Sequence, residues 1–264
     1  MKKVAAKKSL GQNFLVDADV ILRIFEAAEV QPTDWVLEIG PGTGVLTFRL
    51  AEMTEKVLAV ELDHQLVERL QQHFVDSQSV SILEGNILDV NLEELLETSG
   101  FAEHPYKIIA NIPYYITAPI IRTLLALKYP PVSLTLMVQE EVADRLSAQP
   151  GKMSLLSMMA QYYATVEKKF IVSKEAFDPV PKVASAVVHI VPKRAYDPEE
   201  DRKIFRLVRA GFSARRKTLV NNLSSSLSLS REFVEEKLVQ LGLRRDIRAQ
   251  ALSVNDWERL KKIL

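Results

Sequence analysis

The amino-acid sequence predicts an α/β fold, in which helices wrap a parallel sheet and a small all-helical domain follows at the C-terminus. Over the first 140 residues, short apolar runs alternate with helical patterns, and this alternation indicates a parallel sheet. Beyond Pro192 the patterns are helical only. The 264 residues, 47% hydrophobic and 26% charged, are typical of a globular protein and exclude disordered, collagen-like and fibrous classes.

Five apolar runs in the first part are short, continuous and rich in branched residues, as expected for buried parallel strands. They are Trp35–Ile39, Val57–Val60, Val80–Leu83, Lys107–Ala110 and Leu134–Val138. Apolar residues three to four positions apart predict helices between these strands. The expected helices are Asp17–Glu29, His64–Phe74 and Pro119–Leu127.

The second part of the chain changes character near residue 195. A helix is expected at Met153–Tyr163, then strands at Val166–Ser173 and Val183–Val191, joined by the proline-rich segment Phe177–Lys182. The following segments show only helical spacing: Glu199–Phe212, Lys217–Leu227, Arg231–Leu241 and Asn255–Leu264. We therefore expect a domain over residues 1–195 and a helical domain over residues 196–264.

The composition limits the chemistry and the location. Without cysteine, the chain can form no disulfide, thiolate metal site or cysteine nucleophile. Its four histidines lack the spacing of metal ligands, so we expect no metal. No apolar run approaches the ~18 residues of a membrane span, and the lysine-containing N-terminus lacks the apolar region of a secretory signal. We expect a cytoplasmic protein.

The net charge is zero, from 34 basic and 34 acidic residues, which taken alone argues against a nucleic-acid partner. The distribution changes this inference. Residues 196–264 hold 15 basic and 10 acidic residues, a net of +5, and the first eight residues hold four lysines. Within the tail, Arg202–Lys217 contains seven basic residues and no acidic one. Two basic patches on an acidic body are compatible with an RNA partner, although a basic helix face can also be merely solvated.

A glycine-rich turn follows the first expected strand, at Glu38-Ile-Gly40-Pro-Gly42-Thr-Gly44. Glycines let the backbone turn sharply and approach a ligand closely. Glu61 ends the next strand, 21 residues after Gly40, where an acidic residue can accept hydrogen bonds from ribose hydroxyls. Together they predict a site for an adenosine-containing cofactor. The alternative is a turn that only packs a helix on a strand.

The segment Asn111-Ile112-Pro113-Tyr114 ends the fourth expected strand, at the edge where open α/β sheets bind ligands. The Asn111 side-chain oxygen can accept from an exocyclic amine, and Pro113 holds Ile112 extended, so that its carbonyl can be aimed at the same amine. Tyr114 offers a ring on which a base can stack. This pattern suits a flipped-out base. The alternative is a proline turn with an aromatic residue in the core.

The combination resembles the S-adenosylmethionine-dependent adenine-N6 methyltransferases of rRNA, and more narrowly the KsgA/RsmA family. Five segments carry the resemblance: Gly11-Gln-Asn-Phe-Leu15, Glu38–Gly44, Asn111–Tyr114, Phe177–Val188 and Phe212–Leu223. It covers nearly the whole chain, and Phe177–Val188 with Ala214-Arg-Arg-Lys217 separates this family from the macrolide-resistance methylases. It implies a Rossmann-like methyltransferase sheet, S-adenosyl-L-methionine as cofactor and dimethylation of two adjacent adenosines near the 3′ end of small-subunit (16S) rRNA.

The resemblance also implies roles for individual residues. Asn13 and Leu15 would border the methionine and its reactive methyl group, Gly40 and Gly42 would lie against the cofactor, and Glu61 would bind its ribose. Asn86 stands where the family usually has an aspartate that accepts from the cofactor's adenine amine, so either Asn86 accepts more weakly or Asp89 shares the role. Alternatively, Gly11–Leu15 is a helix lead-in with Asn13 and Asp17 as caps.

At the target base, the resemblance implies that Asn111, Ile112, Pro113 and Tyr114 hold the adenine, with Phe177 stacked on the face opposite Tyr114. Phe177 could instead be a core residue beneath the proline-rich loop. Phosphate contacts would come from the basic C-terminal helix, from Arg206, Arg209, Arg215, Arg216 and Lys217.

The expected partner is small-subunit rRNA or the immature small ribosomal subunit, with no membrane and a monomeric protein. The alternative functions are a large-subunit rRNA adenine methylase of the macrolide-resistance type, an assembly factor that acts mainly by binding, and a small-molecule methyltransferase. The last would leave Gln12-Asn-Phe-Leu15 and the basic C-terminal helices without an evident purpose.

Overall fold

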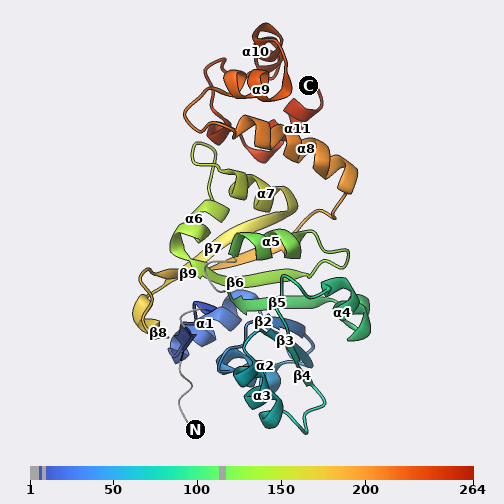
Figure 1. Cartoon of the computed structure of the whole chain (residues 1–264), viewed down its shortest axis with the longest axis vertical. Helices are drawn as coiled ribbons and strands as arrows, with labels where there is room; N and C mark the ends of the chain where they lie inside the picture. The colour runs from blue at the N-terminus through green and yellow to red at the C-terminus, as the bar shows by residue number, and fades with distance from the viewer. Residues whose placement is uncertain (1–5, 8–9, 113–116) are drawn as a thin grey trace. The chain divides into compact units, whose positions relative to one another are not determined.

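A computed structural model describes residues 6–7, 10–112 and 117–264 and contains a seven-stranded sheet with the order β4-β3-β2-β5-β6-β9-β7 (Figure 1). The strands of this sheet are β2 (Trp35–Ile39), β3 (Lys56–Glu61), β4 (Val80–Glu84), β5 (Tyr106–Asn111), β6 (Ser133–Gln139), β7 (Ala164–Val172) and β9 (Ser185–Pro192). Two short strands, β1 (Phe14–Leu15) and β8 (Phe177–Asp178), form a separate antiparallel pair.

The strands from β4 to β6 are parallel, whereas β9 runs antiparallel to β6. The expected α/β architecture is confirmed, but the sheet is mixed rather than wholly parallel, because β9 pairs with β6 in the opposite direction. From β2 the chain moves outward to β3 and β4 and then returns to place β5 on the other side of β2. Such a reversal of strand order opens a crevice at the carboxyl ends of the strands, where ligands bind in α/β folds.

The helices are defined by their apolar spacing and by capping side chains. Those of the first part are α1 (Ala18–Ala28), α2 (Val45–Met53), α3 (His64–His73), α4 (Leu92–Thr98), α5 (Thr117–Leu125), α6 (Glu140–Leu146) and α7 (Leu155–Tyr163). They are followed by α8 (Pro198–Gly211), α9 (Leu219–Leu227), α10 (Arg231–Gln240) and α11 (Val254–Lys261). Three short 3₁₀ turns are η2 (Phe101–Glu103), η4 (Lys174–Ala176) and η5 (Ala249–Ala251). Asp17, Asp63 and Asp197 accept backbone N–H bonds as N-caps of α1, α3 and α8.

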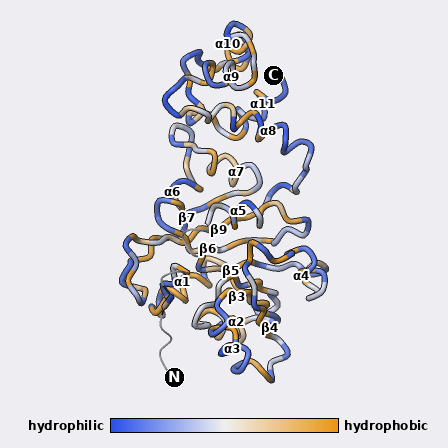
Figure 2. The backbone as a smooth tube through the Cα atoms, in the orientation of Figure 1, coloured by the Kyte–Doolittle hydropathy of each residue, from blue (hydrophilic) through white to orange (hydrophobic). Residues whose placement is uncertain are grey.

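The core beside the site is formed by one face of the sheet and the helices α1 and α2. Val20, Ile24 and Phe25 of α1 are buried in one cluster with Val36 of β2 and Ile109 of β5. The central strands are predominantly hydrophobic (Figure 2). Burying each such side chain stabilises the fold by on the order of 1.5–3 kcal/mol. This packing holds the ends of the strands in place, so the turns that follow them start from fixed positions.

The chain divides into two compact units. The first consists of Met1–Ala143 and Thr165–Lys193, and the second of Asp144–Ala164 and Arg194–Leu264. Within the second unit, the Tyr163 hydroxyl donates to a carboxylate oxygen of Asp201 over 2.6 Å. Residues 144–164 therefore belong with the C-terminal helices in these units, whereas the sequence analysis places them with the sheet. The functional division at residue 195 stays a prediction.

The basic segment of the second unit differs from its expected form. Helix α9 begins at Leu219, with Thr218 as N-cap, and not at Lys217. Arg215, Arg216 and Lys217 therefore lie in the connection between α8 and α9, whereas Arg206 and Arg209 lie on α8. The side-chain amide of Asn222 donates to the carbonyl oxygens of Gly211 (2.6 Å) and Ala214 (3.0 Å) and thereby holds this connection.

Two expected absences concern membranes and metals. Across the described ranges, none of the helices is both long and apolar enough to cross a membrane. The same ranges contain no group of three or more histidine, cysteine, aspartate or glutamate side chains arranged to hold a metal ion.

Candidate functional site

A cavity in the first unit lies where β2, β3, β4 and β5 end. It brings together residues that are far apart in the sequence: the N-terminal segment 10–15, the glycine turn, and the residues that follow β3, β4 and β5. The predicted site residues that line it are Asn13, Leu15, Gly40, Gly42, Glu61, Asn86, Asn111, Ile112 and Phe177. Pro113 and Tyr114 lie outside the described residues.

The glycine turn bends tightly at the end of β2. The Gly40 N–H donates to the carbonyl oxygen of Val60 over 2.9 Å, which extends the β2–β3 pairing into the turn. Gly42 has a φ of +59°, and a Cβ atom there would lie 3.3 Å from the Phe14 ring. This left-handed conformation strongly favours glycine, and the missing side chain leaves room for the N-terminal segment to close over the turn.

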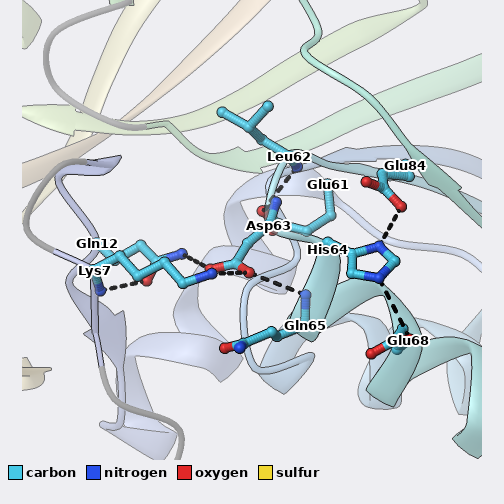
Figure 3. A network of polar contacts seen from close by, with 9 residues as sticks. All are labelled: Lys7, Gln12, Glu61, Leu62, Asp63, His64, Gln65, Glu68 and Glu84. Atoms are coloured by element: carbon cyan, nitrogen blue, oxygen red, sulfur yellow. Dashed lines mark hydrogen bonds and ion pairs between the residues drawn. The ribbon is translucent and has the colours of Figure 1, made fainter.

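Glu61 lines the cavity, and its carboxylate accepts hydrogen bonds from several backbone N–H groups (Figure 3). One of its oxygens accepts from the Leu62 and Asp63 N–H groups and the other from the Gly42 N–H, each over 2.9 Å. The side chain is 7% exposed. A carboxylate offers about four acceptor positions, so about one remains for a hydroxyl of a ligand.

Glu38 is a second acidic residue at the base of this site, directly before Ile39 and Gly40, which line the cavity. Its side chain is 1% exposed, and neither carboxylate oxygen has a hydrogen-bond partner among the described residues. Burial raises the pKa of Glu38 to about 8; the nearby Thr47 hydroxyl opposes this shift and the Glu61 charge adds to it. At neutral pH we therefore expect Glu38 to be protonated in the ligand-free protein.

Replacing Glu38 with glutamine should flatten the pH dependence of stability. The pKa of Glu38 rises from 4.5 to about 8 on folding, so between these values the unfolded chain releases a proton that the folded chain retains. The free energy of unfolding of the wild type therefore falls as pH rises, by on the order of a few kcal/mol from this group. Urea unfolding at several pH values between 5 and 8 measures it. A constant difference between the two proteins would contradict the expectation.

Asn86 lines the cavity in the turn after β4. Its amide nitrogen donates to Asp89 over 2.8 Å, and its amide oxygen accepts from the Leu88 N–H over 3.2 Å. Asp89 is exposed and does not line the cavity. Asp89 therefore orients the Asn86 amide, whose oxygen retains one acceptor position for a ligand.

Asn111 and Ile112 lie at the carboxyl end of β5. The Ile112 N–H donates to the carbonyl oxygen of Met137 over 3.1 Å, which fixes the backbone at this point. The Asn111 side chain is half-buried and makes no hydrogen bond within the described ranges, so its amide oxygen is available. Phe177 lines the cavity but is 2% exposed and belongs to the hydrophobic core; a base-stacking role for it stays a prediction.

The N-terminal segment forms one wall of the cavity. Leu15 pairs with Phe177, and Phe14 with Asp178, so β1 attaches this segment to β8. Asp17 is the N-cap of α1, as expected. Asn13 caps no helix; its amide donates to the carbonyl oxygen of Gly11 over 3.1 Å.

Leu62 and Ile87 are among the apolar cavity residues that were not predicted from the sequence. Leu62 follows Glu61 and is 43% exposed, although large hydrophobic side chains are commonly buried. Ile87 follows Asn86 in the same way. Each directly follows a predicted polar site residue, and this position in the sequence is the signal that could have identified both as cavity residues.

The basic residues predicted to bind RNA lie in the second unit. Arg206, Arg209, Arg215, Arg216 and Lys217 are exposed, and none forms an ion pair with another residue of the described chain. By contrast, Lys203 on α8 contacts Glu199 (2.8 Å) and Glu200 (3.1 Å). Unpaired cations remain free to contact phosphates.

Comparisons with known proteins agree with these observations. Residues 3–264 match the sequence model of a family described as ribosomal RNA adenine dimethylase. The chain is 40% identical to the ribosomal RNA small subunit methyltransferase A of Alkaliphilus metalliredigens, over 98% of this chain and 92% of the relative. It is 38% identical to the protein of that name from Pediococcus pentosaceus, over 97% and 89% of the two chains.

Solved structures show the same fold. The 23S rRNA methyltransferase ErmE superposes with a TM-score of 0.76 at 26% identity, over 96% of this chain and 99% of that one. A dimethyladenosine transferase from Plasmodium falciparum superposes with a TM-score of 0.77 at 24% identity, over 95% and 98%. The similarity thus includes the sheet and the C-terminal helices.

Proposed function

Because this chain belongs to the ribosomal RNA adenine dimethylase family, whose enzymes use S-adenosylmethionine, we propose that it dimethylates N6 of two adjacent adenosines near the 3′ end of small-subunit (16S) rRNA. The observation that carries this proposal is that Glu61, Asn86 and Asn111 line one cavity. The N-terminal segment forms one wall of the same cavity. These groups accept hydrogen bonds, as recognition of an adenosine cofactor and an adenine amine requires.

The cavity suits S-adenosylmethionine on the evidence of its own polar atoms. Glu61 keeps about one acceptor position for a ribose hydroxyl, and we assign to the Asn86 amide oxygen the hydrogen bond from an adenine amine. Leu62 and Ile87 supply apolar contacts for the ring. The Glu38 carboxyl, which has no hydrogen-bond partner among the described residues, lies directly before the turn. We assign Asn13, Leu15, Gly40 and Gly42 to the methionine end.

The bound cofactor supplies an electrophilic methyl group on a sulfonium. The lone pair of adenine N6 is delocalised into the ring, so the protein must make this nitrogen a better nucleophile. The side-chain oxygen of Asn111 and the carbonyl oxygen of Ile112 would accept the two N6 hydrogens and favour a pyramidal nitrogen. Catalysis of this kind depends on positioning and on fixed dipoles, and the proton leaves after attack.

Dimethylation places a second requirement on the pocket. After the first transfer one N–H remains, and the protein must hold a methyl group where a hydrogen was. We propose that Phe177 bounds the target base on the face opposite Tyr114, which lies outside the described residues. Because Phe177 is 2% exposed, its contact with a base requires Leu15 or the neighbouring cavity wall to adjust.

We assign RNA binding to the basic residues of the second unit that form no ion pair with another described residue. Arg206 and Arg209 lie three positions apart on the exposed face of α8, and Arg215, Arg216 and Lys217 follow in the connection that Asn222 holds. Phosphate contacts of this type give affinity and offset the cost of flipping a base, which is a few kcal/mol.

Replacing Arg215, Arg216 and Lys217 together with glutamine should weaken binding to small-subunit RNA by about tenfold or more at low salt. The slope of log affinity against log salt should become shallower by about 2 to 3, because three phosphate contacts are lost. Filter binding over a salt series measures both values. The control is Lys203→Gln, since Lys203 is already paired with Glu199 and Glu200; an equal effect of that control would contradict the assignment.

The function is tested by incubating the protein with labelled cofactor and undermethylated small subunits, large subunits or naked RNA, followed by RNA digestion. Label in N6,N6-dimethyladenosine of small subunits supports the proposal, and its absence there overturns it. The likeness to ErmE keeps large-subunit methylation as a second candidate, which label on large-subunit RNA alone would favour.

We also propose that the protein acts as a cytoplasmic monomer on the immature small subunit. The separation of an acidic body from a basic tail supports directed rather than general RNA binding. An assembly role through binding alone predicts that a catalytically inactive variant still rescues subunit assembly.

A further inference from the structure

The N-terminal segment has a second attachment besides β1. The Lys7 N–H donates to the Gln12 side-chain oxygen over 2.8 Å, and the Lys7 carbonyl accepts from the Leu10 N–H over 3.1 Å. Both side chains then reach the same carboxylate. Lys7 Nζ contacts one oxygen of Asp63 over 2.7 Å, and the Gln12 amide donates to the other over 2.9 Å (Figure 3).

This contact differs from an ordinary surface ion pair. The Asp63 side chain is 1% exposed, whereas that of Lys7 is 40% exposed. Burial alone would raise the pKa of Asp63, but hydrogen bonds from Lys7, Gln12 and the Gln65 N–H, with the Lys7 charge, lower it overall. A buried carboxylate that is this fully hydrogen-bonded forms stronger contacts than exposed pairs do. Asp63 is therefore a fixed anchor for Lys7 and Gln12.

The anchor lies beside the cavity on the same short stretch of backbone as Glu61. The Asp63 N–H donates to Glu61, whose other oxygen accepts from Gly42. Gln12, which Asp63 holds, belongs to the stretch Leu10–Asn13 that lines the cavity. Residues 14–15 are held by β8, so this stretch is fixed by Asp63 within it and by β8 directly after it.

We propose that Asp63 is a positioning residue for the cofactor: by holding Lys7 and Gln12, it keeps the wall Leu10–Asn13 closed across the cavity and sets how long the cofactor stays bound. This inference rests on the proposed assignment of the cavity to S-adenosylmethionine. Its physical basis is that Gln12, which is part of this wall, is hydrogen-bonded to the same carboxylate that binds Lys7. Loss of the attachment frees this wall without touching the Glu61 carboxylate.

A purely structural role for Asp63 is the competing explanation, because it is also the N-cap of α3 and accepts from the Gln65 N–H. The cap needs Asp63 but does not need Lys7. Lys7→Met therefore removes the ion pair and preserves both the Gln12–Asp63 hydrogen bond and the cap, while Lys7→Arg retains the charge. Asp63→Asn keeps an oxygen for Gln65 but loses the charge that binds Lys7. Lys128→Met is a matched control, because it breaks the exposed ion pair with Glu97.

The first measurement is hydrogen exchange of the cofactor-free proteins at the Leu10 and Gln12 amides. Lys7→Met should accelerate exchange about tenfold, the change that a loss of ~1.4 kcal/mol would produce. Lys7→Arg should stay within about threefold of the wild type, and Lys128→Met should have no effect. Unchanged exchange in Lys7→Met would overturn the inference, whether or not the protein binds a cofactor.

The second measurement is the release rate of S-adenosylhomocysteine, the demethylated product, followed by displacement. Lys7→Met and Asp63→Asn should each accelerate release about tenfold, and the double variant should release no faster than the faster single variant, because both remove one contact. Faster exchange with unchanged release would overturn the positioning role. A wild type that binds no S-adenosylhomocysteine would overturn the cavity assignment instead, so the two failures are distinguishable.

Discussion

Asn111→Ala is expected to slow methyl transfer by about 10²- to 10³-fold, the usual effect of removing one preorganised hydrogen-bonding group from an active site. The side chain of Asn111 lines the cavity at the end of β5 and makes no hydrogen bond in the described part of the chain. Its oxygen is therefore free to accept from adenine N6. Removing it loses an interaction that strengthens as the nitrogen becomes pyramidal, so the rate falls more than the affinity for the cofactor.

The measurement is a single-turnover rate with saturating cofactor and small subunits. Thermal unfolding and cofactor binding serve as controls, because the Asn111 side chain makes no hydrogen bond among the described residues and the variant should fold normally. Asn111→Asp separates charge from shape, since it retains an acceptor but adds a negative charge next to the cavity that holds Glu61. A rate for Asn111→Ala within about threefold of the wild type would contradict the role assigned to this residue.

Glu61→Ala is expected to raise the dissociation constant of the cofactor by at least about 100-fold, an effect of about 2.7 kcal/mol. The variant removes the ribose acceptor and also leaves the N–H groups of Gly42, Leu62 and Asp63 without their acceptor. Unsatisfied buried donors cost about 1–3 kcal/mol each, so the glycine turn should loosen as well. Glu61→Gln keeps one oxygen and is expected to lose less affinity.

Titration calorimetry with S-adenosylhomocysteine measures these affinities. Glu84→Ala is the matched control: Glu84 is the register partner of Glu61 on the neighbouring strand, but it pairs with His64 and does not line the cavity. Its affinity should stay within about threefold of the wild type. Equal losses in the Glu61 and Glu84 variants would show that general negative charge, rather than the Glu61 contacts, supports binding.

Much of the architecture could be predicted because the strands have strong local signals. Trp35–Ile39 was expected with the bounds that β2 has, since a run of large apolar residues can only be buried. The direction of β9 could not be predicted, because its antiparallel pairing with β6 depends on which strand lies at the edge of the folded sheet and not on the local sequence. The start of α9 was misplaced by two residues, because Thr218 is a better N-cap than a basic residue.

At the candidate site, too, some features could be predicted from the sequence and others could not. Glu61 was selected from its position at the end of an apolar run and Asn86 from the family resemblance, and both line the cavity. The hydrogen bonds of Glu61 to Gly42, and of Asp63 to Lys7 and Gln12, had no sequence signal. They join residues about 19 to 56 positions apart, and such contacts exist only after the sheet has formed.

The sequence by itself determined which segments become strands and helices, where the ligand-facing turns lie, and that a neutral chain carries a basic tail, because these properties depend on local side-chain pattern. The tertiary structure alone decided which groups remain free to act. It uses three acceptor positions of Glu61, buries Glu38 without a hydrogen-bond partner among the described residues, and ties the N-terminal wall to Asp63. Hydrogen-bond capacity and burial arise only when distant segments are brought together, and they set the chemistry of each side chain.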